Sequence, residues 1–330
     1  MIEALLELEE LKRGKNLLAF SGGVDSTALF FLLQKLNIKT DLALINYQTR
    51  ATSDDEESFA KELGVEFGVD VFTTKAPEFK SDFENRAREF RYSFFEEIIE
   101  RGSYQNLLTA HHLGDRLEWF FMKLFRGSGV VELLGMEPKE IRFTKGGKRY
   151  SLIRPLLNLT KDELLEFLDS GGFRYFIDES NFDTKFERNY IRAKFANPIL
   201  KDYKDGIKRS FEYLQRDREY LNSCFLLKKR IKNLAIFEIK SRFCLDRAIN
   251  SYLREFNLKL SKRERELLKS QNSLVIARRF VAELRENILF IAPFIKTPLP
   301  KRFKEECRVL KIPPKIRVYL HQAEINPREL

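Results

Sequence analysis

The chain has 330 residues, of which 43% are hydrophobic and 33% are charged, and its formal net charge is +10. This length is enough for two or three domains with cores of their own, and the composition is ordinary for a soluble protein. No apolar run approaches the roughly 20 residues that are needed to cross a membrane. The N-terminal segment 1–5 is acidic and is not expected to be a signal peptide. We therefore expect a cytoplasmic protein that does not contact a membrane.

The charge is distributed unevenly along the chain. Residues 201–330 contain 31 Lys and Arg against 16 Asp and Glu, whereas residues 1–200 contain 28 basic and 33 acidic residues. A basic segment of this kind predicts a polyanionic partner such as a nucleic acid. A solvated, lysine-rich helical surface would give the same asymmetry and is the alternative.

The three cysteines Cys224, Cys244 and Cys307 are widely spaced and form no Cys-x-x-Cys motif. Such a pattern predicts neither a zinc site nor a disulfide framework.

The stretch around which the chain is organised begins after a short N-terminal helix, with an apolar run at 16–20. That run leads into a glycine loop, and the apolar periodicity after the loop predicts a helix. Adjacent glycines let the backbone approach a ligand, and a helix N-terminus favours a bound phosphate. Hydroxyl groups and one carboxylate complete a nucleotide site with Mg²⁺ on the carboxylate. The residues of this loop are Ser21, Gly22, Gly23, Val24, Asp25 and Ser26. The alternative is an ordinary capped strand–turn–helix.

Further strands and helices alternate after the loop. Strands are predicted at 41–47, 69–73 and 106–110, and helices at 53–63 and 83–101. This alternation predicts an α/β fold with a doubly wound parallel sheet. Ligands of such sheets bind beyond the carboxyl ends of the strands, so the loop and the residues after the fourth strand should face one crevice.

The segment after the fourth strand combines two histidines with two carboxylates. If Asp115 opens a helix, Asp115 and Glu118 share one helical face. His111 and His112 precede them, but these residues are a thin ligand set for zinc. A helix-capping cluster and a substrate pocket both remain possible interpretations.

The rest of the chain gives weaker signals. Residues 125–136 predict a loop that can close over a ligand, and 145–149 a basic turn between two short strands. Thr160 with Glu163 predicts a capping box. We interpret residues 207–232 as one long basic helix, 233–271 as helical, and 273–292 as a hairpin. The predicted domains are a catalytic domain at 1–200, a linking helix at 201–232 and a basic, mainly helical region at 233–330.

Seven motifs in order over about residues 15–195 resemble the tRNA(Ile)-lysidine synthetase family of pyrophosphate-loop ATPases. They are SGGVDS at 21–26, the Asn-Arg-Ala-Arg run that ends at Arg91-Tyr92, HHxxDxxE at 111–118, RGSG and LLGM within 126–136, IRPLL at 153–157, DESNFD at 178–183 and RNYIR at 188–192. The chain departs from the family where Gly114 replaces the usual Asp, Trp119 the usual Thr and Tyr47 the expected His. Its tail is similar to the C-terminal tRNA-contacting module of longer members, but is shorter.

The resemblance implies a ligase that uses ATP and Mg²⁺ to join free lysine to C2 of the wobble cytidine of tRNA(Ile) with a CAU anticodon. It implies that the loop binds ATP, with Asp25 also at the metal. It further implies that His111, Asp115 and Glu118 bind lysine, with the carboxylates helping to deprotonate it. Arg91, together with Arg188 or Arg192, would offset the charge of an adenylated base. The basic C-terminal part would bind tRNA.

Two alternatives to this function remain. Another pyrophosphate-loop enzyme, such as a tRNA 2-thiolase, would share the loop, although the chain has no Cys-x-x-Cys and no cysteine close to the loop in sequence. An inactive tRNA-binding relative would share the fold, although the intact SGGVDS motif, Asp115 and Glu118 argue against it.

Overall fold

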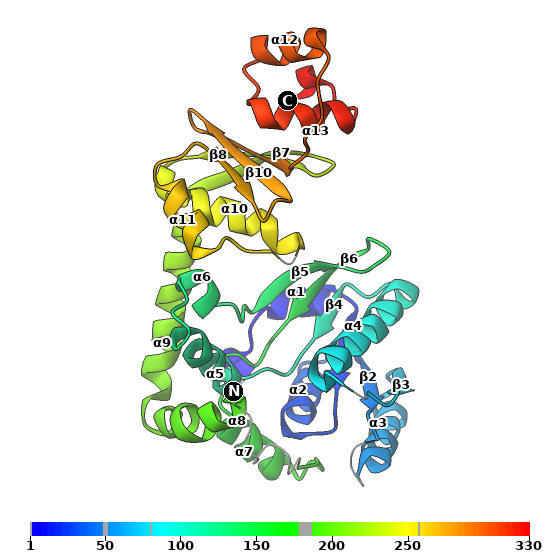
Figure 1. Cartoon of the computed structure of the whole chain (residues 1–330). Coiled ribbons are helices and arrows are strands. Elements are labelled where there is room, and N and C mark those ends of the chain that lie inside the picture. The colour runs from blue at the N-terminus through cyan, green and yellow to red at the C-terminus, as the bar shows by residue number, and fades with distance from the viewer. Residues whose placement is uncertain (1, 49–51, 80, 178–186, 257) are drawn as a thin grey trace. The chain divides into compact units, whose positions relative to one another are not determined.

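A computed structural model describes residues 2–48, 52–79, 81–177, 187–256 and 258–330 (Figure 1). The chain divides into two compact units, Met1–Leu214 (unit 1) and Gln215–Leu330 (unit 2). The division lies within the long helix α9 (Asn197–Asn222). Within the described residues, no helix combines the length and the apolar character that a membrane crossing requires.

Unit 1 is built on a six-stranded sheet in the order β3-β2-β1-β4-β6-β5. All neighbouring strands pair in parallel except β5, which pairs antiparallel with β6. The parallel doubly wound sheet predicted from the alternation of strands and helices is therefore confirmed, with one antiparallel edge strand. The strands are β1 (Asn16–Phe20), β2 (Thr40–Asn46), β3 (Val71–Lys75), β4 (Asn106–Leu108), β5 (Lys139–Phe143) and β6 (Arg149–Ile153).

Both faces of this sheet are covered, because successive side chains of a strand point to opposite faces. On β1, Leu18 packs into a core shared with α2, α3 and α7, whereas Leu17 packs into a second core with α4. A third cluster joins α5 to the first part of α9. The helices of unit 1 are α1 (Leu8–Arg13), α2 (Val24–Lys35), α3 (Ser53–Phe67), α4 (Phe83–Gly102), α5 (Leu113–Leu124), α6 (Val130–Leu133), α7 (Lys161–Gly171) and α8 (Glu187–Ile191).

Unit 2 is a three-layer structure around an antiparallel sheet in the order β7-β8-β11-β10-β9. Alternate residues of β8 divide its core: Ala235 and Phe237 pack with α10 and α11, and Leu234 and Ile236 with α12 and α13. The two outer layers are helical, as expected, and the hairpin predicted at 273–292 supplies three of the five strands. The elements are β7 (Phe225–Ile231), β8 (Leu234–Ile239), α10 (Leu245–Leu253), α11 (Lys262–Leu268), β9 (Ser273–Ile276), β10 (Phe280–Arg285), β11 (Ile288–Pro293), α12 (Lys301–Val309) and α13 (Pro314–Gln322).

The interpretation of residues 207–232 as one helix is wrong beyond Asn222. Residues Phe225–Ile231 form β7, and Leu234–Ile239 form β8 within the stretch expected to be helical. β7 is an edge strand whose central residues are exposed, so it lacks the apolar alternation that marks a half-buried strand. Its Leu, Lys and Arg residues are also good helix formers, and pairing with β8 overrides that local preference.

The cysteine pattern was also misread, because Cys224 and Cys244 form a disulfide within unit 2. The two residues are 20 positions apart in sequence, and their Cα atoms lie 6.1 Å apart once β7 and β8 have paired. Spacing alone does not determine such a pairing. Cys307 is free and buried.

Candidate nucleotide and amine site

The glycine loop leads from the carboxyl end of β1 into α2. Gly22 has a φ of 72°, which favours glycine, and Gly23 is the N-cap residue of α2. A Cβ atom at Gly22 would lie 3.3 Å from the Phe176 ring, so the loop has little room for a side chain there. The first N–H groups of α2 have no partner within the helix, and the prediction that they bind a phosphate remains a prediction.

Hydroxyl groups and a neighbouring segment hold the loop in place. The N–H of Ser21 donates to Oγ of Ser26 at 3.2 Å, and that hydroxyl donates to the carbonyl of Gly23 at 3.2 Å. The N–H of Phe176 donates to the carbonyl of Gly22 at 2.9 Å. These contacts fix the backbone before any ligand binds, which lowers the entropy cost of binding.

Asp25 is the carboxylate of the loop, and it has unused bonding capacity. Its Oδ1 atom is buried and has no hydrogen-bond partner within the described residues. Oδ2 lies 3.7 Å from Nζ of Lys161, the first residue of α7, and Oδ1 lies 3.9 Å from Nε2 of His112. A carboxylate oxygen without a partner suits Mg²⁺, which commonly binds one or two carboxylates together with substrate phosphates.

The segment after β4 caps α5 and presents two carboxylates. His112 is the N-cap residue, and its Nδ1 accepts from the N–H of Gly114 at 2.9 Å. Oδ2 of Asp115 accepts the N–H of His112 at 3.0 Å, which completes a capping box. The helix therefore begins at Leu113 rather than at Asp115. The capping interpretation is confirmed, and it leaves the remaining oxygen of Asp115 and both oxygens of Glu118 to other partners.

Those partners are two arginines from α8 and the π-helical turn after it, which together with the two acids form the carboxylate–arginine cluster (Asp115, Glu118, Arg188, Arg192). Arg188 donates to Oδ1 of Asp115 at 2.5 Å and to Oε2 of Glu118 at 2.9 Å. Arg192 donates to Oε1 of Glu118 at 2.5 Å and to Oε2 at 3.2 Å. Asp115 and Glu118 are three residues apart on α5, and Arg188 and Arg192 are four residues apart on the opposite segment, so each pair lies on one helical face. Figure 1 shows α5 and α8 side by side.

The two carboxylates of the cluster are buried, whereas Arg188 is about half exposed, and the opposite charges stabilise one another. Glu118 is 1% exposed and Asp115 is 8% exposed. Burial alone would raise the pKa of Asp115, but His112, His111 and Arg188 and the N–H of His112 hold it well below its usual range. Burial would lower the pKa of Arg188, but Asp115 and Glu118 raise it. The Asp115 carboxylate is therefore held as an anion beside Arg188.

His111 and Arg91 lie near the same edge but in different surroundings. Nδ1 of His111 is 3.0 Å from Oγ1 of Thr109, and burial lowers the pKa of His111 to about 4. Nε of Arg91, on α4, donates at 3.0 Å to the hydroxyl of Tyr47, which directly follows β2. Within the described residues, the structure does not bring Arg91 into contact with the carboxylate–arginine cluster. The motif at 178–183 lies outside the described residues.

Two residues near Asp25 were missed as site residues by the sequence analysis. The capping box at Thr160 and Glu163 is confirmed, with Oγ1 of Thr160 accepting from the N–H of Glu163 at 3.3 Å. This cap places the next residue, Lys161, beside Asp25. His112 was treated only as a metal ligand or a cap. The capping motifs were visible in the sequence, but nothing in it indicates that both caps lie next to the loop.

The segment 125–136, predicted to close over a ligand, is fastened to α5. Nε1 of Trp119 donates to the carbonyl of Glu132 at 2.8 Å, and a Cβ atom on Gly135 would lie 3.0 Å from that nitrogen. Trp119, which replaces the usual Thr of the family, thus packs against the segment. Among the described residues, no group of three or more His, Cys, Asp or Glu side chains could hold a metal ion.

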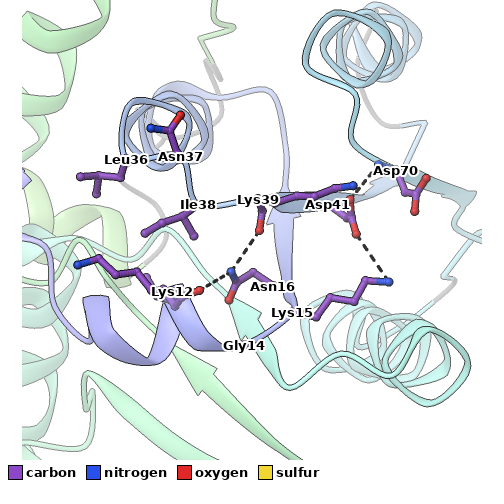
Figure 2. A pocket seen from close by; sticks show the side chains of 11 residues that line it. Lys12, Gly14, Lys15, Asn16, Leu36, Asn37, Ile38, Lys39, Asp41 and Asp70 are labelled. Atoms are coloured by element: carbon purple, nitrogen blue, oxygen red, sulfur yellow. Dashed lines mark hydrogen bonds and ion pairs between the residues drawn. The ribbon is translucent and has the colours of Figure 1, made fainter.

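A separate cavity of about 620 Å³ lies at the amino ends of β1 and β2, the edge opposite to the loop (Figure 2). Its polar groups are engaged with one another. The amide of Asn16 donates to the carbonyls of Leu11 and Lys39, and Oδ1 of Asp41 accepts the N–H of Asp70. We assign these contacts to the packing of the strand ends rather than to a ligand site.

Comparisons with known proteins bear on the catalytic chemistry. The family model ATP_bind_3, described as a PP-loop domain, matches residues 2–199. The chain is 44% identical over 316 residues to the tRNA(Ile)-lysidine synthase of Campylobacter jejuni (strain RM1221), covering 96% of this chain and 95% of that protein. It is 44% identical over 329 residues to the tRNA(Ile)-lysidine synthase of Wolinella succinogenes, and this alignment covers 98% of this chain and 97% of that protein. These alignments span almost the whole length of both relatives.

Among solved structures, the chain is similar to the U34-tRNA thiolase NcsA from Methanococcus maripaludis. The likeness covers 65% of this chain and 77% of that one, at 17% identity and a TM-score of 0.49. A likeness at this level carries no inference about activity.

Proposed function

The chain belongs to the tRNA(Ile)-lysidine synthase family, and from this premise we propose that it joins free lysine to C2 of the wobble cytidine of tRNA(Ile) with a CAU anticodon. The reaction consumes ATP, forms a carbon–nitrogen bond and releases AMP and pyrophosphate. The observation that carries the proposal is the pairing of a phosphate-binding loop with a buried pair of carboxylates. His112 lies between them, with Nε2 3.9 Å from Asp25 and 3.7 Å from Asp115.

In the first half-reaction, the C2 oxygen of cytosine attacks the α-phosphorus of ATP, and the bond to the β-phosphate breaks. The N–H groups after Gly22 and Gly23 and the hydroxyls of Ser21 and Ser26 bind the phosphates. Val24 begins α2 and is buried, which anchors the loop. Mg²⁺, which Asp25 and the phosphates would hold, supplies charge neutralisation when it is bound.

In the second half-reaction, the ε-amine of lysine attacks C2, and AMP leaves with the former C2 oxygen. A free lysine ammonium has a pKa of about 10.4 and must lose a proton first. Asp115 and Glu118 bind the lysine and accept this proton, and His111 forms part of the same pocket. Arg188 and Arg192, which already contact the carboxylates, offset the charge of the adenylated base. Arg91 of α4, whose Nε donates to the hydroxyl of Tyr47 beside the end of β2, has the same role.

The tRNA is assigned to the basic C-terminal part. Residues 215–330 contain 27 Lys and Arg against 13 Asp and Glu. Such an excess favours a polyanion, and tRNA identity is then recognised through shape and unstacked bases. We assign catalysis to unit 1 and tRNA binding to unit 2. Of the link predicted at 201–232, only the part up to Asn222 is helical, because β7 belongs to the sheet of unit 2. Since its substrates are tRNA, ATP and lysine, we assign the protein to the cytoplasm.

The cysteines give no support to a thiolase. Residues 1–214 contain no cysteine, Cys224 and Cys244 are joined to each other, and Cys307 is buried. Burial also raises the pKa of the Cys307 thiol, which disfavours the nucleophilic thiolate.

The test is incorporation of labelled lysine into tRNA(Ile) transcripts with a CAU anticodon, in the presence of ATP and Mg²⁺. We expect AMP, pyrophosphate and lysine-bearing tRNA in equal amounts, and no incorporation into a transcript whose wobble cytidine is replaced by uridine. Lysine-independent transfer of sulfur to the same tRNA, or tRNA binding without any turnover, would contradict the proposal.

A further inference from the structure

His112 lies where the two halves of the proposed site meet. Its side chain is 8% exposed, and its Nε2 atom lies 3.9 Å from Oδ1 of Asp25 and 3.7 Å from Oδ2 of Asp115. Both distances are too long for a hydrogen bond. Within the described part of the chain, the hydrogen bond of the ring is made at Nδ1 and not at Nε2. The residue therefore has bonding capacity at the junction that the fold itself does not use.

The hydrogen bond at the other ring nitrogen determines what His112 offers there. The N–H of Gly114 donates to Nδ1 at 2.9 Å, and an amide N–H can only donate. Nδ1 must then be the acceptor, so a neutral ring carries its hydrogen on Nε2. The ring thus presents an N–H donor to the space between Asp25 and Asp115.

The neighbouring glycine makes this ring position possible. A Cβ atom on Gly114 would lie 2.6 Å from Cε1 and 2.9 Å from Nδ1 of His112, closer than packed atoms approach. Any side chain at position 114 would push the ring away from the cap. Gly114 is also the position where the family usually has Asp, so the placement of His112 is tied to a residue particular to this chain.

We propose that His112 donates its Nε2–H to a non-bridging oxygen of the α-phosphate in both half-reactions. This proposal rests on the proposed function. The α-phosphorus is attacked beside the loop and later leaves as AMP when the amine attacks beside Asp115. Its oxygens must therefore lie between the two carboxylates, where the donor is. Because Nδ1 accepts the N–H of Gly114, His112 acts on the phosphate only as a donor through Nε2. It stabilises charge on the phosphate and transfers no proton.

Two substitutions of the full-length protein separate this role from capping. His112→Asn keeps an acceptor in the position of Nδ1 but has no donor in the position of Nε2. His112→Gln can reach the position of Nε2 with its amide N–H but caps the helix poorly. We expect His112→Asn to slow adenylation and lysine transfer about 100-fold, and His112→Gln to stay within about 10-fold of the wild type.

A substituted nucleotide tests the contact itself. ATP in which sulfur replaces one non-bridging α-oxygen should react more slowly with the wild type for one of its two diastereomers. The same replacement should cost His112→Asn nothing further, since the contact has already been lost. Gly114→Ala should resemble His112→Asn in rate, although alanine favours a helix more than glycine does.

The opposite pattern would overturn the proposal. If His112→Asn reacts like the wild type while His112→Gln is slow and less stable, His112 only caps α5. Equal losses in both variants at unchanged stability, or equal thio effects in the wild type and His112→Asn, would also exclude the donor role. A wild type that incorporates no lysine contradicts the proposed function instead, which keeps the two failures distinct.

Discussion

The glycine loop and the carboxylate–arginine cluster belong to the same edge of one sheet but are prepared for ligands differently. The loop has unmet bonding capacity, since Oδ1 of Asp25 has no hydrogen-bond partner within the described residues. In the cluster, both oxygens of Asp115 and both of Glu118 already accept hydrogen bonds from Arg188, Arg192 or the backbone of His112. A nucleotide at the loop, as proposed, would meet an unpaired carboxylate oxygen, whereas a lysine at the cluster would have to share or displace an arginine.

This difference follows from burial. Two carboxylates as buried as Asp115 and Glu118 would be costly without cations, because desolvated charges require partners. Arg188 and Arg192 supply those partners in the absence of substrate. A lysine then enters most easily when the negative charge of an adenylated base attracts the guanidinium groups away. The comparison suggests that ATP chemistry precedes productive binding of lysine.

The largest expected effect concerns the glycine loop. Asp25→Asn removes the charge that would hold Mg²⁺, and we expect pyrophosphate release to fall by about 100- to 1,000-fold with the fold unchanged. Pyrophosphate release is measured with tRNA present and lysine absent. Lys161→Met, which removes the neighbouring cation, is the companion variant. Asp25→Asn protein that releases pyrophosphate at the wild-type rate would disprove the metal role.

Substitutions in the carboxylate–arginine cluster should alter the kinetics of lysine use. Hydrogen bonds to charged groups contribute roughly 1.5–3 kcal/mol, so Asp115→Asn or Glu118→Gln should weaken lysine use about 10- to 100-fold. Adenylation should survive in part, because it needs no contact with the ammonium. The two half-reactions are followed separately in each variant.

Glu163→Gln is the matched control for Asp115→Asn. Both acids close a capping box at the third position of a helix, and Glu163 pairs with Lys204 and Lys208. Its loss should cost stability but leave lysine kinetics unchanged. If Asp115→Asn and Glu118→Gln block adenylation while the apparent affinity for lysine is unaltered, these carboxylates serve ATP or the metal instead.

A smaller effect is expected on stability at acidic pH. Burial lowers the pKa of His111 to about 4, against about 6.5 in an unfolded chain. The unfolded state then binds the proton first, so the stabilisation is complete above about pH 6.5 and is lost as the pH falls towards 4. The loss should be roughly 1–3 kcal/mol, measured by urea unfolding with the fluorescence of Trp119, the single tryptophan. His111→Gln should remove this dependence, and an unchanged profile in that variant would refute it.

The smallest effect tests how rigid the loop is. Gly22→Ala places a Cβ atom 3.3 Å from the ring of Phe176 at a φ of 72° and should cost about 1–2 kcal/mol of stability. We expect a rise of several-fold in the KM for ATP and no change in the KM for lysine. Gly68→Ala, also at a positive φ but with no atom within 4 Å, controls for the backbone effect alone. Equal behaviour of the two variants in ATP kinetics would mean that Phe176 does not constrain the loop.

The local patterns of the sequence determined much of unit 1. Asn16–Phe20 and the glycine loop were predicted to the residue, because a buried strand followed by two glycines leaves few alternatives. The Thr160 capping box was likewise readable, since it depends on two side chains three residues apart. The parallel order of the sheet followed from alternating strands and helices. The family was inferred from the seven motifs that occur in order over about residues 15–195.

Only the tertiary structure decided which of these local features meet. Arg188 and Arg192 lie more than 70 residues from Asp115, and the packing of Ala196 and Leu200 against α5 brings them together. The edge strand β7 and the Cys224–Cys244 disulfide were missed for the same reason, since pairing with β8 creates them. Long-range contacts depend on how the elements pack in three dimensions. A sequence therefore gives the residues of a site more readily than their partners.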